Sequence, residues 1–181
     1  MTALPRALQI ALFVLALAAG AYDLRFRRIP NWLTASGFCL GLALHGWLEG
    51  WPGLQQAILG AGLGLAVYFV LFALRAMGGG DVKLMAAVGA IVGPLNWLVI
   101  FLAASLLGGL IAIILVLSRG TLLRTLWNVL SVLGHLIRGR APYRADPKFD
   151  VSHANAVTLP HGVCIALACF LFLFLTGLQG G

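Results

Sequence analysis

Charged side chains are scarce in this sequence of 181 residues: they make up 9% of it, whereas 61% of the residues are hydrophobic. A soluble domain of ordinary composition carries about 25% charged residues. So few charges cannot provide a water-facing surface for a globule of this size, which excludes an ordinary soluble protein. The composition predicts a protein embedded in a membrane.

Paired cysteines and metal-binding motifs are also missing. The three cysteines, Cys39, Cys164 and Cys169, form no CxxC pair, and all lie inside apolar runs, as small core residues do. This spacing suggests neither a zinc site nor a disulfide framework. The sequence contains neither an HExxH motif nor a GxSxG motif. We therefore expect no metal and no cofactor.

Acidic residues are few, and the twelve Lys and Arg against five Asp and Glu give a net charge of +7. A nucleic-acid-binding protein displays such charge on a polar surface. Here the basic residues stand in short gaps between apolar runs, where they meet lipid headgroups and determine topology. The pattern indicates membrane lipid as a partner and no nucleic acid.

Long apolar runs make up most of the rest of the sequence. A run of about 20 residues is enough to span the hydrocarbon core of a bilayer. Gly93-Pro94 interrupts the longest stretch and predicts a tight turn between two helices. The sequence therefore predicts an all-α, polytopic transmembrane helix bundle of about six spans, forming a single membrane-embedded domain over 1–181. The runs are 7–22, 33–48, 54–74, 84–93, 95–117 and 159–177.

The basic residues predict the orientation of these spans. With six spans, eleven of them fall on one side and Arg6 alone on the other. Because cytoplasmic loops retain Lys and Arg, both termini are expected outside. Arg6, the first apolar run and Ala19-Gly20-Ala21 also fit a cleaved signal peptide, but three arginines directly after the run favour a retained span. The eleven are Arg25, Arg27, Arg28, Arg75, Lys83, Arg119, Arg124, Arg138, Arg140, Arg144 and Lys148.

Residues 119–158 differ from the spans and are predicted to form a cytoplasmic segment. Within 121–138, leucines and other apolar residues share one helical face, and Arg124, Asn128 and His135 share the other. This pattern is typical of an amphipathic helix on the inner leaflet, acting as a surface anchor in preference to a substrate dock. The polar stretch after it predicts a loop.

Two of the five acidic residues are placed unusually. Glu49 in an expected outer loop, and Asp146 and Asp150 in the polar loop, are easily solvated. Asp23 and Asp81 instead stand at the ends of apolar spans, where desolvating a carboxylate is costly. The predicted topology puts both on the same side of the membrane.

Two carboxylates at one depth can converge if their helices are neighbours. At close range they cannot both ionise easily, so the pair of Asp23 and Asp81 would hold one proton. The ionised member can then take a proton from water while the protonated member polarises a carbonyl, which is hydrolysis without metal or covalent intermediate. Alternatively, both aspartates only neutralise nearby arginines at headgroup level. The residues alone leave these two interpretations open.

The flanking sequences suit such a site. Gly78-Gly79-Gly80 lacks side chains, so backbone there can approach closely, adopt positive φ and receive an extended substrate strand. Ile29-Pro30-Asn31 predicts a rigid re-entry into the next helix. Lys83 places a positive charge two residues beyond Asp81 that could favour the ionised carboxylate.

These elements resemble those of a known family. The segment from Asp23 to Asn31, DLRFRRIPN, is similar to the D-x5-I-P-N element of type IV prepilin peptidases. The segment 78–84, GGGDVKL, is similar to their G-x-G-D-x-K-L element, the hallmark of GxGD membrane aspartic proteases. Leu159-Pro160-His161-Gly162 resembles the final-span segment of the family, with His161 in place of an aromatic residue.

The resemblance implies that Asp23 and Asp81 are a catalytic pair that removes the short basic leader of prepilin-like proteins at the cytoplasmic face of the bacterial inner membrane. It also implies supporting or substrate-binding roles for Ile29, Pro30, Asn31, Gly78, Gly79, Gly80, Lys83 and Pro160. Larger members carry a CxxC-containing N-terminal segment and N-methylate their product. The chain resembles instead the short, peptidase-only form associated with tight-adherence pili.

Two other functions fit a small basic membrane protein: a proton-coupled transporter, and a non-catalytic assembly subunit of a pilus or secretion machine. Buried histidines such as His45 and His161 are expected to be hydrogen-bonded structural residues. Gly60, Gly62 and Gly64 predict close helix packing. The oligomeric state is left undetermined.

Overall fold

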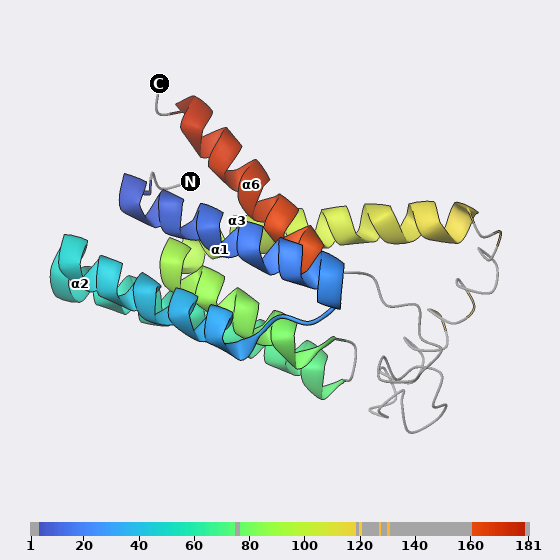
Figure 1. Cartoon of the computed structure of the whole chain (residues 1–181), viewed down its shortest axis with the longest axis horizontal. Helices are drawn as coiled ribbons and strands as arrows, with labels where there is room; N and C mark the ends of the chain where they lie inside the picture. Colours follow the sequence, from blue (N-terminus) through green and yellow to red (C-terminus); the bar gives the residue numbers. More distant parts are fainter. Residues whose placement is uncertain are drawn as a thin grey trace.

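The computed structural model describes residues 4–74, 77–118 and 161–179, together with the single positions 120, 127 and 130. In these parts of the chain all regular structure is helical, which confirms the predicted all-α class. Figure 1 shows the helices packed lengthwise into a bundle. The elements are α1 (Arg6–Phe26), α2 (Asn31–Ala73), α3 (Gly79–Ser118) and α6 (His161–Gln179).

Helix α1 contains the first predicted span and ends on the left-handed residue Arg27. Its buried side chains recur at three- and four-residue spacing, as a helix with one packed face requires, and include Leu8, Leu12, Leu15 and Ala19. Arg27 has φ 50° and ψ 33°, and its N–H donates to the Asp23 carbonyl oxygen over 2.9 Å. This C-terminal cap ends α1 one turn after Asp23.

Helix α2 folds back on itself at Gly50, which has φ 64° and ψ −144° and is followed by Pro52. Gly41 and Gly60 are nineteen residues apart, about 28 Å along a straight helix. A Cβ atom on either of them would nevertheless meet the backbone of the same short stretch of α3, residues 89–91. The two halves of α2, 31–49 and 51–73, are therefore antiparallel neighbours.

The sequence prediction for Glu49 was wrong. Glu49 is helical and lies in the last turn before the bend, not in a loop, because the chain reverses at the single residue Gly50. Its carboxylate lies 3.4 Å from Nδ1 of His45. The other ring nitrogen of His45 is 3.0 Å from the Ile91 carbonyl oxygen, so His45 has the structural role expected of it.

Helix α3 bends in the same way at Gly93, which has φ 74° and ψ 173° and precedes Pro94. Across the bend, Nε1 of Trp97 donates to the Met85 carbonyl oxygen over 3.1 Å. That contact joins residues twelve positions apart, so the two halves of α3 lie against each other. The predicted turn at Gly93-Pro94 is confirmed.

Glycines allow α2 and α3 to approach until their backbones touch. A Cβ on Gly60 would collide with the Gly89 carbonyl oxygen, and one on Gly64 would lie 2.5 Å from the Met85 carbonyl oxygen. The predicted close packing is confirmed at these two glycines. It is wrong for Gly62, which has nothing within 4 Å and faces away from α3.

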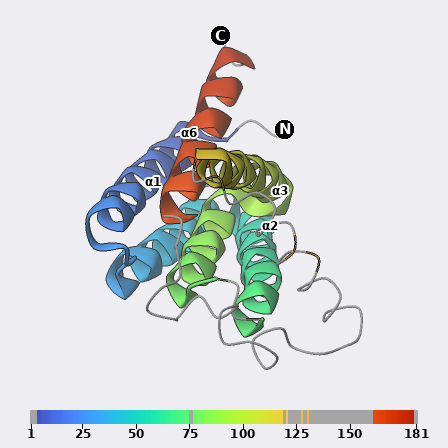
Figure 2. The ribbon, with the colours of Figure 1, turned by 90° about the vertical axis from the view of Figure 1, so that its right-hand side faces the viewer.

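Helix α6 closes the bundle against α1 and α3. Figure 2, an end view, shows α6 lying between α1 and the yellow half of α3. A Cβ on Gly20 would lie 3.0 Å from that of Ala166, and the rings of Phe13 and Phe170 are 5.4 Å apart, so α1 and α6 are antiparallel neighbours. The core includes the fully buried side chains Leu8, Leu12, Tyr68, Leu84, Met85, Ile91, Trp97, Ile100, Ile165 and Phe172.

The outer surface is apolar, as a membrane protein requires. Three helices, α1, α2 and α3, are long and apolar enough to cross a membrane, and α6 contains a shorter apolar stretch, His161–Gly177. Large hydrophobic side chains face outward along them, among them Ile10, Leu59, Phe69, Leu106, Ile114 and Phe174. The count of six spans is not confirmed by these helices alone. The predicted amphipathic helix and polar loop lie outside the described residues, apart from the single positions 120, 127 and 130.

Candidate active site

Several helix ends lie toward one end of the bundle. In Figure 1 the C-terminal end of α1, both ends of α2, the start of α3 and the start of α6 lie toward the same side, and both bends lie at the other. Asp23 stands one turn before the end of α1, and Asp81 is the third residue of α3. The bends at Gly50 and Gly93 therefore bring the two aspartates to the same end, as the topology predicted.

Asp23 is a buried carboxylate, only 7% exposed. Its Oδ2 accepts a hydrogen bond of 3.1 Å from the backbone N–H of Val163, in the first turn of α6. The first turn of a helix has unpaired N–H groups and a partial positive charge, so it stabilises a carboxylate placed against it. The contact spans 140 residues of sequence and fixes α1 to α6 at this point.

Gly162 makes that contact possible. A Cβ atom there would lie 2.9 Å from Asp23 Oδ2 and 3.0 Å from Ile29 Cδ1. Both separations are shorter than ordinary van der Waals contact, so any side chain at this position would displace the carboxylate or the isoleucine. Gly162 belongs to the segment that resembles the final span of the prepilin peptidases. Pro160 of that segment lies outside the described residues.

Asp81 lies in the first turn of α3 and caps it. Its N–H donates to the Gly78 carbonyl oxygen over 3.2 Å, and its carboxylate accepts a hydrogen bond from the Gly78 backbone. This reciprocal pattern resembles a capping box, in which the third helical residue reaches back to the cap. The expected positive φ is wrong for Gly78, Gly79 and Gly80, because α3 already begins at Gly79 and the three glycines lead directly into it.

The side chain of Ile29 joins the two aspartate-bearing segments. Its Cδ1 lies against Gly162, beside Asp23, and its Cβ would lie 3.4 Å from a Cβ on Gly80, the residue before Asp81. The carboxylates of Asp23 and Asp81 are close enough to interact electrostatically. The structure thus brings the predicted pair together around an isoleucine of the Ile29-Pro30-Asn31 element.

Lys83 and Asn31 connect the starts of α3 and α2. Nζ of Lys83 donates to Oδ1 of Asn31 over 2.9 Å. Pro30 is the residue before α2, with φ −69° and ψ 141°, so the chain enters the helix from an extended conformation. The contact fastens the two sequence elements to each other on the exposed side of the site. The predicted effect of Lys83 on the ionisation of Asp81 stays a prediction.

The arrangement does not favour the interpretation in which both aspartates serve arginines. Among the described residues, neither carboxylate forms an ion pair with an arginine, although Arg25, Arg27 and Arg28 lie only a few residues beyond Asp23. Asp23 is held by a backbone amide, and Asp81 by the start of its own helix. Two carboxylates kept close without neutralising cations can share a proton.

Three further residues border the pair. His161 lies near Asp23, and Cys164 lies near both aspartates. Tyr68, on the second half of α2, is buried and lies near Asp81. Sequence reasoning placed His161 and Cys164 in structural roles and did not single out Tyr68 at all. No group of three His, Cys, Asp or Glu side chains able to hold a metal occurs in the described parts of the chain.

The sequence model of the type IV leader peptidase family matches residues 10–113, which are more than half of the chain and contain Asp23 and Asp81. No curated protein and no solved structure matches the chain. The chain belongs to the type IV leader peptidase family, and it is a protease of the leader peptidase kind.

Proposed function

We propose that this protein is a membrane aspartic endopeptidase that removes the short basic leader from prepilin-like proteins at the cytoplasmic face of the bacterial inner membrane. The observation that carries the proposal is the meeting of Asp23 and Asp81 at one end of an apolar helix bundle. The family match favours proteolysis over proton-coupled transport and over a non-catalytic role in assembly.

The carboxylate pair can hydrolyse a peptide bond by general acid–base catalysis. One carboxylate is ionised and removes a proton from a water molecule, whose oxygen attacks the scissile carbonyl carbon. The other carboxyl group gives its proton to the carbonyl oxygen, which forms a tetrahedral diol. When the diol collapses, one of its hydroxyl groups gives a proton to the ionised carboxylate, the C–N bond breaks, and the departing amine takes the proton of the other carboxyl group. The pair again holds one shared proton. The pair needs no covalent intermediate.

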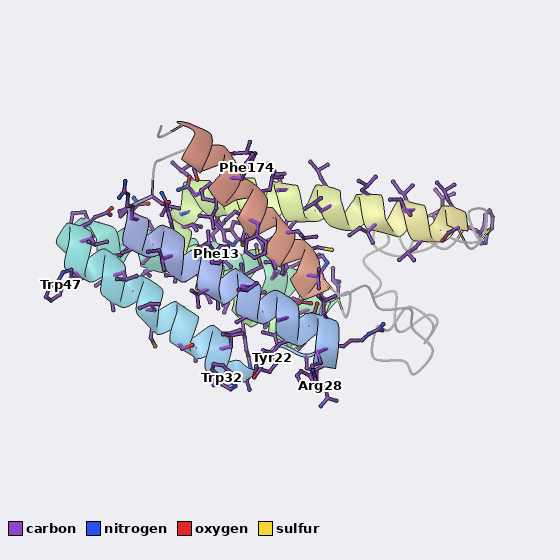
Figure 3. The ribbon with its side chains drawn as sticks, turned by 45° about the horizontal axis from the view of Figure 1, so that its top comes forward. Phe13, Tyr22, Arg28, Trp32, Trp47 and Phe174 are labelled. Carbon is purple, nitrogen blue, oxygen red and sulfur yellow. The ribbon has the colours of Figure 1, made fainter. Side chains whose placement is uncertain are left out.

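Six membrane crossings are supported by the two bends. Helix α2 has 43 residues and α3 has 40, or about 60–65 Å of helix, twice the hydrocarbon thickness of a bilayer. Because each of these helices folds back at its bend, α2 and α3 can each supply two crossings. With one crossing from α1 and one from α6, the total is six. Figure 3 shows Tyr22, Trp32 and Arg28 toward one end of the bundle and Trp47 at the other, as expected of aromatic belts.

The charge distribution supports a cytoplasmic site. Arg25, Arg27 and Arg28 directly follow Asp23 at the site end of α1. Basic residues that flank spans are retained in the cytoplasm, so the aspartates are expected there. A prepilin leader ends where the hydrophobic helix of the prepilin enters the membrane, which is the same depth. Gly78 and Asn31 are exposed and Asp81 is half-buried, so this end of the bundle can receive an extended peptide.

The direct test is the N-terminus of a pilin made with and without this protein. We expect mass spectrometry of the pilin to show loss of the leader in the presence of the protein and an intact leader in a deletion strain. The same spectrum reports N-methylation. Equal maturation in both strains would refute the peptidase, and equal maturation with failed pilus assembly would support the assembly subunit.

A side chain at Gly162 is expected to impair cleavage with little loss of stability. In Gly162→Ala the new methyl group forces Asp23 or Ile29 to move, because it would lie within 3.0 Å of both side chains. Misplacing a reacting group by about 1 Å can cost on the order of 10²-fold in rate. We therefore expect a fall in kcat of about 10- to 100-fold, measured on purified enzyme with a leader-containing substrate.

Gly177→Ala is the matched control, since it makes the same change in the same helix where nothing lies within 4 Å. Its rate is expected to equal that of the unmodified protein. If Gly162→Ala retains full activity, the contact between α6 and Asp23 does not matter for catalysis.

The cleavage rate is expected to pass through a maximum with pH. The pair works with one proton, so the rate falls on the acidic side as both carboxylates become protonated and on the alkaline side as the shared proton is lost. The two apparent pKa values of such a profile belong to the pair and not to either residue. The measurement is kcat against pH with thermal unfolding at each pH as control. A flat profile up to strongly alkaline pH, with the protein intact, would contradict a shared proton.

A further inference from the structure

The packing register of α2 against α3 points to Tyr68. Gly60 touches Gly89, and Gly64 touches Met85, so each step of four residues along α2 is matched by four residues backward along α3. One more step places Tyr68 opposite Asp81. Near the same end, a Cβ on Gly79 would lie 3.5 Å from the Phe72 ring, which agrees with this register. Two glycines and then a tyrosine thus occupy successive turns of one helix face.

The tyrosine ring is enclosed by other rings and is held in place. Tyr68 is 1% exposed. Its ring centroid lies 6.4 Å from that of Trp97 and 6.0 Å from that of Phe101, both edge-on at 78°, and Trp97 and Phe101 stack on each other at 5.3 Å. On the side of α6, the His161 ring lies 6.3 Å away. Helices α2, α3 and α6 all contribute to this enclosure.

A tyrosine buried among apolar rings usually uses its hydroxyl group in a hydrogen bond. Phenylalanine would fill an apolar enclosure without the cost of burying a hydroxyl, so a buried tyrosine usually makes a hydrogen bond. By this register Tyr68 faces Asp81, and its ring lies 6.3 Å from that of His161, which begins α6 two residues before the Val163 N–H that binds Asp23. The ring therefore lies between the start of α3, which carries Asp81, and the start of α6, which binds Asp23.

We propose that Tyr68 is a positioning residue of the peptidase: its hydroxyl donates a hydrogen bond to the ionised carboxylate of Asp81 and holds that carboxylate toward Asp23. The inference rests on the proposed function. Asp23 receives its fixed donor from α6, and Tyr68 supplies the corresponding donor from α2. A carboxylate held by a donor is oriented for proton transfer before substrate arrives.

The test is Tyr68→Phe, which removes only the hydroxyl and keeps the ring in its enclosure. We expect kcat for leader cleavage to fall by about 10- to 100-fold with KM unchanged, because the substrate does not touch Tyr68. Tyr22→Phe is the matched control: the Tyr22 ring packs on Phe26 and Trp32 and should leave both constants unchanged. Unchanged kcat in Tyr68→Phe, or a change in KM alone, would overturn the inference.

A second measurement does not depend on cleavage. If the hydroxyl binds Asp81, Tyr68→Phe lowers the midpoint of thermal unfolding in the unmodified protein but not in an Asp81→Ala background. Equal shifts in both backgrounds would overturn the inference whatever the substrate is. If Tyr68→Phe cleaves at the unmodified rate while Asp81→Asn is inactive, the role proposed for Tyr68 is rejected and the proposed peptidase function is retained. Failure of the unmodified protein to process any prepilin would reject the proposed function, and the unfolding cycle would still decide the contact.

Discussion

Replacing either Asp23 or Asp81 with asparagine is expected to reduce leader cleavage by roughly 10²- to 10⁴-fold, the range that a positioned acid or base contributes. Asparagine has the shape of aspartic acid but can neither hold the shared proton nor accept one from water. Because the two carboxylates act as a unit, the double variant should be no slower than the slower single variant. The measurement is the cleavage rate of purified variants on a leader-containing substrate.

The effect of these substitutions on catalysis must be distinguished from an effect on folding. Asp81 caps α3, and Asp23 accepts the Val163 N–H, so both carboxylates also support the structure. Asparagine retains an acceptor oxygen for each contact, and we expect the unfolding midpoint of both variants to stay close to that of the unmodified protein. Full processing by either variant, once it is inserted and folded, would exclude the pair as the catalytic group.

Glu49→Gln provides the matched control. Glu49 is a carboxylate on the same bundle, beside His45 at the bend of α2, at the opposite end from the aspartates. Its conversion to an amide changes the net charge by the same amount as the aspartate variants do. Cleavage at the unmodified rate is expected. A comparable loss of activity in Glu49→Gln would mean that charge or topology, and not the pair, explains the result.

The sequence predicted those features that follow from local chemistry. Proline cannot continue a helix and glycine tolerates positive φ, so Gly93-Pro94 could be recognised as a turn inside a continuous apolar run. The same logic was available at Gly50 and Pro52, but Glu49 and Trp51 suggested a polar loop where one residue is enough to reverse the chain. The common depth of Asp23 and Asp81 followed from counting spans between basic gaps.

The contacts that complete the site were not predictable from the sequence, because they depend on groups that carry no sequence signal. Every residue but proline has a backbone N–H, so nothing marked Val163 as the donor to Asp23. Tyr68 lies in an apolar run where an aromatic residue is ordinary. Its role depends on the register of α2 against α3, which is fixed only when Gly60 is placed against Gly89. The spacing of Gly60, Gly64 and Tyr68 at four residues is the one signal that could have pointed to it.

Gly60→Ala is expected to destabilise the bundle strongly. The new Cβ would collide with the Gly89 carbonyl oxygen and would lie 2.8 Å from the Gly93 carbonyl carbon. These atoms are backbone, so no side chain can rotate away, and α2 and α3 must separate. Overpacking of a well-packed core costs about 1–3 kcal/mol and occasionally more. We expect the unfolding midpoint in detergent to fall accordingly.

Gly62→Ala controls for the intrinsic effect of replacing glycine in a helix. Nothing lies within 4 Å of a Cβ at Gly62, and alanine is preferred over glycine in a helix by about 0.5–1 kcal/mol, so this variant should be equally or more stable. The two variants make the same chemical change two residues apart in α2, and they should shift the unfolding midpoint in opposite directions. Equal shifts would mean that the backbones of α2 and α3 do not meet at Gly60.

The Gly60 variant should also lose activity, although Gly60 lies about two turns from Tyr68 and touches neither aspartate. Gly60, Gly64 and Tyr68 follow one another along the face of α2 that rests on α3, and the last of these steps faces Asp81. Any separation at Gly60 therefore changes where Asp81 lies relative to Asp23, which is fixed independently by α6. A variant that is less stable but cleaves at the unmodified rate below its unfolding midpoint would show that the two carboxylates do not depend on this register.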